Sequence, residues 1–197
     1  MNDTIDYYNR NGELFASSTV DVEFGEHQDA FLALLRPGAC ILDFGCGSGR
    51  DAKCFLEKGF RVDAVDGSEV MCAIASAFTG LDVKRMHFQD LAAVELYDGI
   101  WACSSILHLP RAELENVFAM MIRALKPHGI IYTSFKYGNF EGARSGRYFT
   151  DMTEERFERF LAPFRNVQLI RSWVTGDVRS GRENEKWLNL LLEKRAS

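Results

Sequence analysis

Long hydrophobic runs, internal repeats and proline-rich linkers are all missing from this sequence of 197 residues, which contains four prolines. Residues 99–110, one of the two longest uncharged stretches, fall well short of the about 20 apolar residues that a membrane helix needs. The first residues are polar and do not resemble a signal peptide. These absences predict a cytoplasmic protein without membrane contact that folds as one domain over residues 1–197.

Patterns typical of metal sites and disulfide frameworks are also absent. The five cysteines are an odd number, and no two of them have the short spacing of a zinc knuckle. All five lie among apolar residues, so we expect buried, reduced thiols and no metal site.

Basic residues are scarce in most of the chain. The sequence has 23 Lys and Arg against 28 Asp and Glu, a net charge of −5, and no lysine-rich run, which disfavours a nucleic-acid partner. Residues 1–140 hold 12 bases and 19 acids, whereas residues 141–197 hold 11 bases, nine of them arginine, and nine acids. Because the planar guanidinium suits carboxylates and phosphates, we expect the late segment to be locally basic where it faces a substrate.

What the sequence does contain is a regular alternation of strand-like and helix-like segments, with enough apolar residues (47%) for a core. Apolar runs predict five strands, at residues 39–44, 60–65, 83–86, 100–103 and 130–135. The segments between them have helical spacing, most clearly at residues 114–125. Repeated βα units imply a mostly parallel sheet.

The C-terminal part departs from this alternation. Thr153 is placed to cap one more helix, through residue 160. Residues 167–174 and 187–192 then read as two strands without a long helix between them, which predicts an antiparallel pair at the edge of the sheet.

The string DFGCGSG, residues 43–49, lies between the first predicted strand and a predicted helix. Glycines there allow a tight turn and close approach of a ligand to the backbone, and the helix behind offers free N–H groups. Asp66 ends the second predicted strand, 21 residues after Gly45, where a carboxylate can accept both hydroxyls of a ribose. Asp90 follows the third strand and is a candidate acceptor for an adenine amino group. Three alternatives remain. The string can be a plain glycine turn with only a structural role, Asp66 can simply lead into the next helix, and Asp90 can be an ordinary loop aspartate.

Five strings in fixed order, ILDFGCGSGRDA, VDGS, FQDL, YDGIWACSSILHLP and LKPHGIIY, resemble the motifs of class I S-adenosylmethionine-dependent methyltransferases. The likeness covers residues 36–135. It implies a Rossmann-like, doubly wound, three-layer αβα fold whose seven-stranded, mostly parallel sheet has an antiparallel edge strand. The string GCGSGRDA and the small size resemble the tellurite-resistance and thiopurine-type branch, whose members methylate small acceptors.

The resemblance also implies a set of S-adenosylmethionine contacts. The glycine loop would face the methionine part, the VDGS string the ribose, the FQDL string the adenine, and the end of the fourth strand the sulfonium. Asp43 would orient the loop and contact the amino group directly or through water. The implied contacts are Tyr8, Asp43, Gly45, Cys46, Gly47, Asp66, Gly67, Ser68, Asp90, Leu91, Cys103 and Ser104. The Asp or Asn that exocyclic-amine methylases carry after the fourth strand is absent, which disfavours that acceptor class.

His108 is the candidate general base, because an imidazole can take a proton from the acceptor near neutral pH. The alternative is a histidine that merely precedes a helix. Methyl transfer from a sulfonium has a good leaving group, so alignment and exclusion of water can also supply much of the rate without a base.

The two ends of the chain flank the cofactor-binding core at residues 39–135. Residues 1–35 are expected to form an N-terminal lid in which Tyr8 covers the cofactor, the alternative being a helix whose aromatic face packs on the sheet. Residues 136–197 would form the acceptor side and the antiparallel strands. The substrate-binding candidates there are Arg144, Arg147, Tyr148, Trp173 and Arg179, with solvated surface arginines as the alternative.

Together these observations predict an S-adenosylmethionine-dependent methyltransferase that methylates a small molecule. We expect the protein to be a monomer or a homodimer, and the small molecule to be anionic if the late arginines bind it. Three alternatives stay open. They are a non-catalytic S-adenosylmethionine-binding or regulatory module, a methyltransferase acting on tRNA, other RNA or protein, and an NAD-dependent oxidoreductase. The last is disfavoured because the chain lacks a second catalytic domain and a YxxxK pair after the fourth strand.

Overall fold

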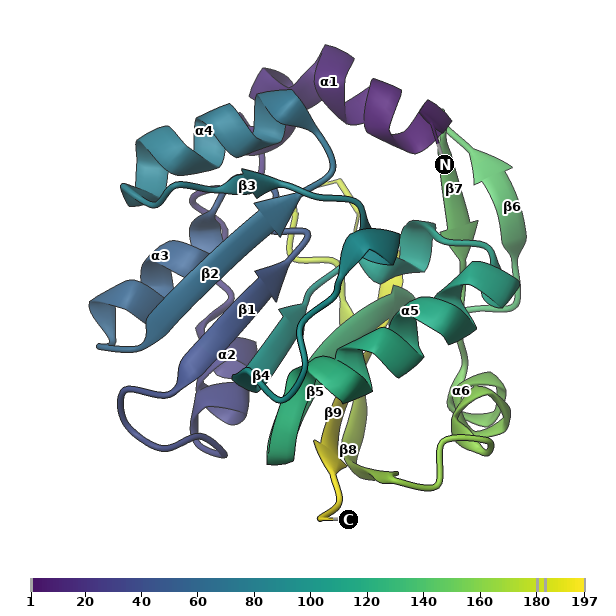
Figure 1. Cartoon of the computed structure of the whole chain (residues 1–197). Helices are drawn as coiled ribbons and strands as arrows, with labels where there is room; N and C mark the ends of the chain where they lie inside the picture. Colours follow the sequence, from purple (N-terminus) through teal and green to yellow (C-terminus); the bar gives the residue numbers. More distant parts are fainter. Residues whose placement is uncertain (1, 180, 183, 197) are drawn as a thin grey trace.

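The computed structural model describes residues 2–179, 181, 182 and 184–196, and a seven-stranded sheet runs through its centre (Figure 1). Across the sheet the strands are β3 (Lys84–Arg85), β2 (Arg61–Asp66), β1 (Cys40–Phe44), β4 (Tyr97–Ala102), β5 (Leu125–Lys136), β9 (Lys186–Lys194) and β8 (Val167–Gly176). The first five are parallel, whereas β9 is antiparallel to both β5 and β8. The predicted sheet is confirmed. The strand that opposes the others is β9, one place in from the edge, because a short loop joins it directly to β8.

Helices cover both faces of this sheet. Buried residues of α5 (Arg111–Ala124) and α6 (Glu154–Leu161) belong to one hydrophobic cluster, and buried residues of α2 (Gly25–Leu32), α3 (Arg50–Glu57) and α4 (Glu69–Thr79) belong to the other. The three-layer αβα arrangement is therefore confirmed. Side-chain caps begin two helices: Ser68 Oγ accepts the backbone N–H of Met71, and Thr153 Oγ1 accepts that of Arg156.

Several strand boundaries differ from those predicted, and β4 begins at Tyr97 rather than at residue 100. β3 is only two residues long, where four were expected. β5 begins at Leu125, directly after α5, because Leu125 pairs with Tyr97 before the register shifts at Gly99. Residues 126–129, which lie between the predicted helix and the predicted strand, are therefore part of β5.

A β-hairpin after β5 was not predicted. β6 (Glu141–Arg144) and β7 (Arg147–Thr150) pair in antiparallel fashion around the two-residue turn Ser145–Gly146. Both turn residues have left-handed backbone angles, with φ of 50° and 75°, as a type I′ turn requires. The turn brings Arg144 directly opposite Arg147.

The N-terminal helix α1 (Asn2–Ser17) lies across the carboxyl ends of the parallel strands, between α4 and the β6–β7 hairpin (Figure 1). At the hairpin, Thr4 Oγ1 accepts the N–H of Tyr148 at 3.0 Å. Towards α4, the Ser68 hydroxyl donates to Asn9 Oδ1 at 2.7 Å. α1 is thus tied to the hairpin near its first turn and to the start of α4 near its middle. Within the described residues, no helix has the length and hydropathy to span a membrane.

Candidate cofactor and acceptor site

A cavity of about 680 Å³ opens at the carboxyl ends of the parallel strands, beneath α1. Its walls come from the glycine loop, α1, the β6–β7 hairpin and the loop between β8 and β9. The volume lies in the range of about 300–1,000 Å³ that is usual for small-molecule sites. The position agrees with the rule that open α/β sheets bind ligands where the strand order reverses, here between β1 and β4.

The glycine loop needs glycine at Gly45 for a steric reason. Its φ is 84°, and a Cβ atom there would lie 2.5 Å from the Cβ of Ser105. Gly47, with φ of 55°, lines the cavity, where a Cβ would meet only side-chain atoms of Phe15 and Met71 at 3.8 and 3.9 Å. The loop therefore presents bare backbone to a ligand.

Asp66 ties the glycine loop to the start of α4. Its Oδ2 accepts the N–H of Gly47 at 3.0 Å, and its Oδ1 accepts the N–H of Ser68 at 2.8 Å. Burial raises the pKa of Asp66, and these backbone donors oppose the rise. Each carboxylate oxygen can accept a second hydrogen bond, so the group can still take two ribose hydroxyls. Gly67 and Ser68 line the cavity beside it.

Asp43 provides a test of whether a cofactor fits. The residue is only 2% exposed, yet its Oδ2 has no hydrogen-bond partner among the described residues and the side chain lines the cavity. Burial, reinforced by the charge of Asp51, raises the pKa of Asp43 well above its usual value. A buried carboxylate oxygen without a donor is costly, and the ammonium of a bound amino acid would satisfy it.

Arg50 and Asp51 complete this end of the cavity, and sequence reasoning missed both. Arg50 makes a bidentate ion pair with Asp51, with both nitrogen–oxygen distances at 2.9 Å, and its guanidinium lies 4.5 Å from the centroid of Phe24. The indole of Trp101 also donates to Asp51. Asp43 and Arg50 thus offer an acceptor and a donor set to the amino-acid part of a ligand. The arginine that directly follows the glycine loop was the available signal.

Asp90 and Leu91 are not among the residues that line the cavity. Asp90 is exposed at the end of a short 3₁₀ turn (Phe88–Asp90), and Leu91 is buried in the core. Phe88 and the two residues before it, Met86 and His87, line the cavity instead. The prediction that Asp90 and Leu91 hold the adenine is therefore not supported, because the tight turn directs the residues before Asp90 to the site.

Cys103 and Ser104 line the cavity just after β4. Ser104 has a left-handed φ of 52°, and its N–H donates to Ser134 Oγ at 2.9 Å. Such a conformation in a residue other than glycine marks a backbone held in place by its surroundings. Burial raises the pKa of Cys103 to about 12, so its thiol is protonated at neutral pH and is not a nucleophile.

Tyr8, His108 and Arg147 form one hydrogen-bonded chain along the cavity wall. His108 Nδ1 lies 2.6 Å from the carbonyl oxygen of Tyr148, which only accepts, so Nδ1 carries the proton. Nε2 is then the acceptor for the Tyr8 hydroxyl at 3.1 Å, and that hydroxyl accepts from Arg147 Nη1 at 3.2 Å.

This chain speaks against His108 as the general base. Burial lowers the pKa of His108 to about 4, with Arg147 and Arg144 adding to the effect and the Tyr148 carbonyl opposing it. Its Nε2 lone pair is already engaged by Tyr8. A general base needs a free lone pair facing the acceptor and a pKa near the working pH, and His108 has neither here.

The acceptor-side candidates divide according to strand geometry. Arg144, Arg147 and Arg179 line the cavity, whereas Tyr148 and Trp173 do not. Tyr148 lies between two inward residues of β7, so its ring faces away from the cavity and its hydroxyl donates to Glu141. Trp173, on β8, packs against the rings of His27 and Tyr132. The predicted substrate contacts of Tyr148 and Trp173 are therefore not supported.

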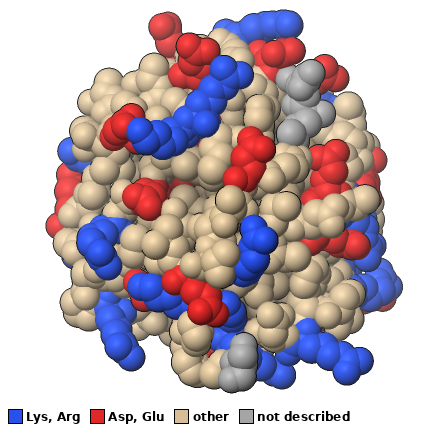
Figure 2. All heavy atoms as spheres, viewed as in Figure 1, with Lys and Arg blue, Asp and Glu red and all other residues tan. Residues whose placement is uncertain are grey.

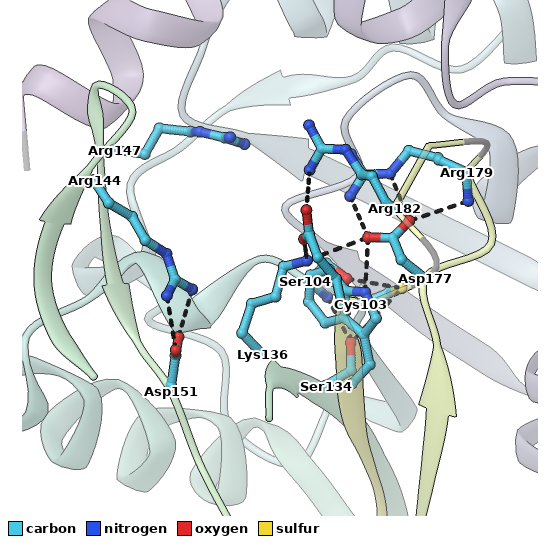
Figure 3. A network of polar contacts seen from close by, with 12 residues as sticks. Cys103, Ser104, Ser134, Lys136, Arg144, Arg147, Asp151, Asp177, Arg179 and Arg182 are labelled. Atoms are coloured by element: carbon cyan, nitrogen blue, oxygen red, sulfur yellow. Dashed lines mark hydrogen bonds and ion pairs between the residues drawn. The ribbon is translucent and has the colours of Figure 1, made fainter. Parts of the chain in front are cut away.

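Most of the cavity's basic side chains are neutralised by carboxylates that sequence reasoning missed (Figure 3). Arg144 pairs with Asp151 through two bonds of 2.7 and 2.8 Å, and Arg179 pairs with Asp177 at 2.6 Å. Lys136 contacts both Asp177 and Glu185. Asp151 follows Arg144 by seven residues, and the acids paired with Lys136 follow it by 41 and 49 residues, so nothing local indicated those pairs. The pair of Arg179 with Asp177 is local, because Asp177 precedes Arg179 by two residues.

Comparisons with known proteins agree with this geometry. A methyltransferase-domain family model matches residues 41–129. A protein of Staphylococcus carnosus (strain TM300) described as an uncharacterized methyltransferase is 30% identical over 169 residues, which covers 78% of this chain and 81% of the relative. The chain belongs to the class I S-adenosylmethionine-dependent methyltransferases. S-adenosylmethionine is accordingly its cofactor.

Two further similarities, one in sequence and one in fold, are to methyltransferases whose names state a substrate. The sterol 24-C-methyltransferase erg6 of Schizosaccharomyces pombe is 27% identical over 158 residues, which covers 74% of this chain but 38% of the relative. In fold, the methyltransferase is similar to the 1,6-didemethyltoxoflavin-N1-methyltransferase of Burkholderia thailandensis, with a TM-score of 0.77 at 21% identity, over 97% of this chain and 85% of the other. The tellurite-resistance or thiopurine-type branch stays a prediction.

Proposed function

We propose that the methyltransferase transfers the methyl group of S-adenosylmethionine to a small molecule bound between the β6–β7 hairpin and the β8–β9 loop. The supporting observation is that the cavity extends from the glycine loop to this region while α1 closes over it. α1 contacts α4 and the hairpin on either side, which favours an acceptor that fits beneath a helix over one that lies along an open groove.

The surface charge supports the same choice. On the face shown in Figure 2, basic and acidic side chains alternate over the surface without a continuous basic stripe. Nucleic-acid binding draws most of its affinity from such a stripe. The names of two similar proteins, a sterol methyltransferase and a didemethyltoxoflavin methyltransferase, also refer to small organic molecules.

The proposed reaction is an in-line displacement in which the acceptor's lone pair forms the new bond to the methyl carbon as the carbon–sulfur bond breaks. S-adenosylmethionine supplies a sulfonium leaving group that departs as a neutral thioether. The protein's part is to hold the reactants in line and to exclude water, which supplies much of the rate for such reactions. Asp43, Arg50 and Asp66 anchor the cofactor's two ends, and α1 closes the site.

The test is an acceptor screen that measures release of S-adenosylhomocysteine. The protein and S-adenosylmethionine are incubated with thiols, selenium and tellurium oxyanions, carboxylates, amines and short RNAs. We expect turnover with a small molecule. Turnover with RNA alone would overturn the proposal, and tight binding of S-adenosylmethionine without turnover of any acceptor would favour a regulatory module.

A further inference from the structure

We propose that Arg147 binds an anionic group of the methyl acceptor, a carboxylate or a phosphate. This inference rests on the proposed function, because it places the anion in the same cavity and on the same small molecule. It separates Arg147 from the other late arginines, which the sequence alone treats as equivalent.

Arg147 differs from the other cavity arginines in its lack of a carboxylate partner. Arg50, Arg144, Arg179 and Arg182 each form an ion pair with an acid of the cavity wall. Among the described residues, Arg147 alone of these guanidinium groups has none. Its charge is therefore available to a ligand, whereas the charge of each of the others is already balanced by a carboxylate.

The hairpin turn places a second positive charge beside Arg147, so repulsion destabilises the site unless an anion compensates it. Arg144 and Arg147 are directly opposite each other across the turn, a placement that is unfavourable for two like charges. Asp151 neutralises Arg144. Nothing comparable neutralises Arg147, so an anion bound there would relieve the repulsion as well as form new hydrogen bonds.

The immediate neighbours of Arg147 are neutral and aromatic. Its guanidinium carbon lies 4.5 Å from the ring centroid of Tyr7, 5.8 Å from that of Tyr8 and 5.2 Å from that of Phe149. His108 is uncharged at neutral pH because its pKa is lowered to about 4 by burial and by the positive charges of the hairpin. These neighbours hold the guanidinium in place and shield it from water without cancelling its charge.

The hydrogen-bonding capacity of Arg147 is mostly unused. A guanidinium has five N–H donors. Within the described part of the chain, Arg147 donates from Nη1 to the Tyr8 hydroxyl, and its buried Nε has no acceptor. Figure 3 shows Arg144 turned towards Asp151, whereas the Arg147 side chain extends from the hairpin towards the network of Lys136, Asp177 and Arg179. The free donors thus face the part of the cavity assigned to the acceptor.

The first test measures anion binding directly. Protein saturated with S-adenosylhomocysteine is titrated by calorimetry with acetate and, separately, with inorganic phosphate in a buffer of low ionic strength. We compare wild type, Arg147→Met, Arg147→Lys and Arg171→Met. The last is a matched control, because Arg171 stacks on Trp173 outside the cavity and its loss changes the net charge equally.

We expect wild type and Arg171→Met to bind one of the two probes with equal affinity. Arg147→Met should bind about tenfold or more weakly, because a charge-assisted hydrogen bond is lost, and Arg147→Lys should be intermediate. Unchanged affinity in Arg147→Met would overturn the proposal, and so would a wild type that binds neither probe. An equal loss of S-adenosylhomocysteine affinity in Arg147→Met would also overturn it, since the arginine would then belong to the cofactor site.

A second test separates this inference from the proposed function. Carboxylic acids and their neutral amides are compared as acceptors, with S-adenosylhomocysteine release as the readout. Turnover of acids with a raised KM in Arg147→Met supports both proposals. Turnover restricted to neutral small molecules would overturn the role of Arg147 and leave the proposed function standing. Anion binding at Arg147 with turnover of RNA alone would overturn the proposed function and the placement of that anion on a small acceptor.

Discussion

The Tyr8 hydroxyl donates to Nε2 of His108 at 3.1 Å, so helix α1 is bonded directly to the 3₁₀ turn (Ile106–His108) that comes after β4. The carbonyl of Tyr148 fixes the other ring nitrogen as a donor, and the imidazole therefore has no free lone pair. His108 is in this arrangement a fixed acceptor that holds α1, with Tyr8 connecting it to Arg147.

Replacing His108 by Asn should leave turnover within a few-fold of wild type, because Asn can keep the bond to the Tyr148 carbonyl and no proton transfer is lost. The measurement is kcat with an acceptor found in the screen, over pH 5–9. General bases contribute about 10²–10⁴-fold to rates, so a loss of that size would restore His108 as the base.

The depressed pKa of His108 also predicts a pH dependence of stability. The unfolded histidine takes up a proton near its ordinary pKa of about 6.5, whereas the folded one does so only near pH 4. Stability from this group is therefore present above about pH 6.5 and lost as the pH falls towards 4. The melting temperature of wild type should fall more steeply over this window than that of His108→Asn. Parallel curves would contradict the assignment.

Asp43→Asn should change stability and cofactor affinity in opposite directions. Burial raises the pKa of Asp43 well above its usual value, so the ionised form is unfavourable in the folded protein at neutral pH. A neutral Asn should raise the melting temperature of the ligand-free protein and weaken S-adenosylhomocysteine binding about tenfold, because the partner of the ammonium loses its charge. A variant in which the melting temperature and the S-adenosylhomocysteine affinity both rise, or both fall, would rule out this role for Asp43.

Asp66 and Asp90 offer a matched comparison in the cofactor site. Asp66→Ala should weaken S-adenosylhomocysteine binding by about 1.5 kcal/mol or more, since it removes an acceptor of ribose hydroxyls. Asp90→Ala should leave the affinity nearly unchanged, because Asp90 is exposed and is not a lining residue. Calorimetry on both variants decides the point. An equal loss of S-adenosylhomocysteine affinity in the two variants would show that Asp90 also contacts the cofactor.

S-adenosylmethionine and S-adenosylhomocysteine should each raise the melting temperature, whereas NADH should not. Ligands that bind only the folded state stabilise it by about 2.7 kcal/mol at a concentration of 100 times Kd. Stabilisation by NADH alone would contradict the cofactor assignment despite the family match.

Local sequence was sufficient wherever structure depends on residues close together in the chain. The glycine loop, the cap at Thr153, the helix of residues 114–125 and Asp66 at the end of β2 were all predictable, because turn geometry, capping and apolar spacing are short-range properties. The order of motifs was enough to indicate the family.

Only the tertiary structure decided which residues of the acceptor side do what. The sequence shows a run of arginines, but their roles depend on whether a carboxylate from another segment reaches them: Asp151 reaches Arg144, and no acid among the described residues reaches Arg147. Likewise, His108 looks like a base until the fold buries it beside Tyr8 and two arginines. Charge and proton affinity depend on distance and solvent exposure, and long-range folding determines both.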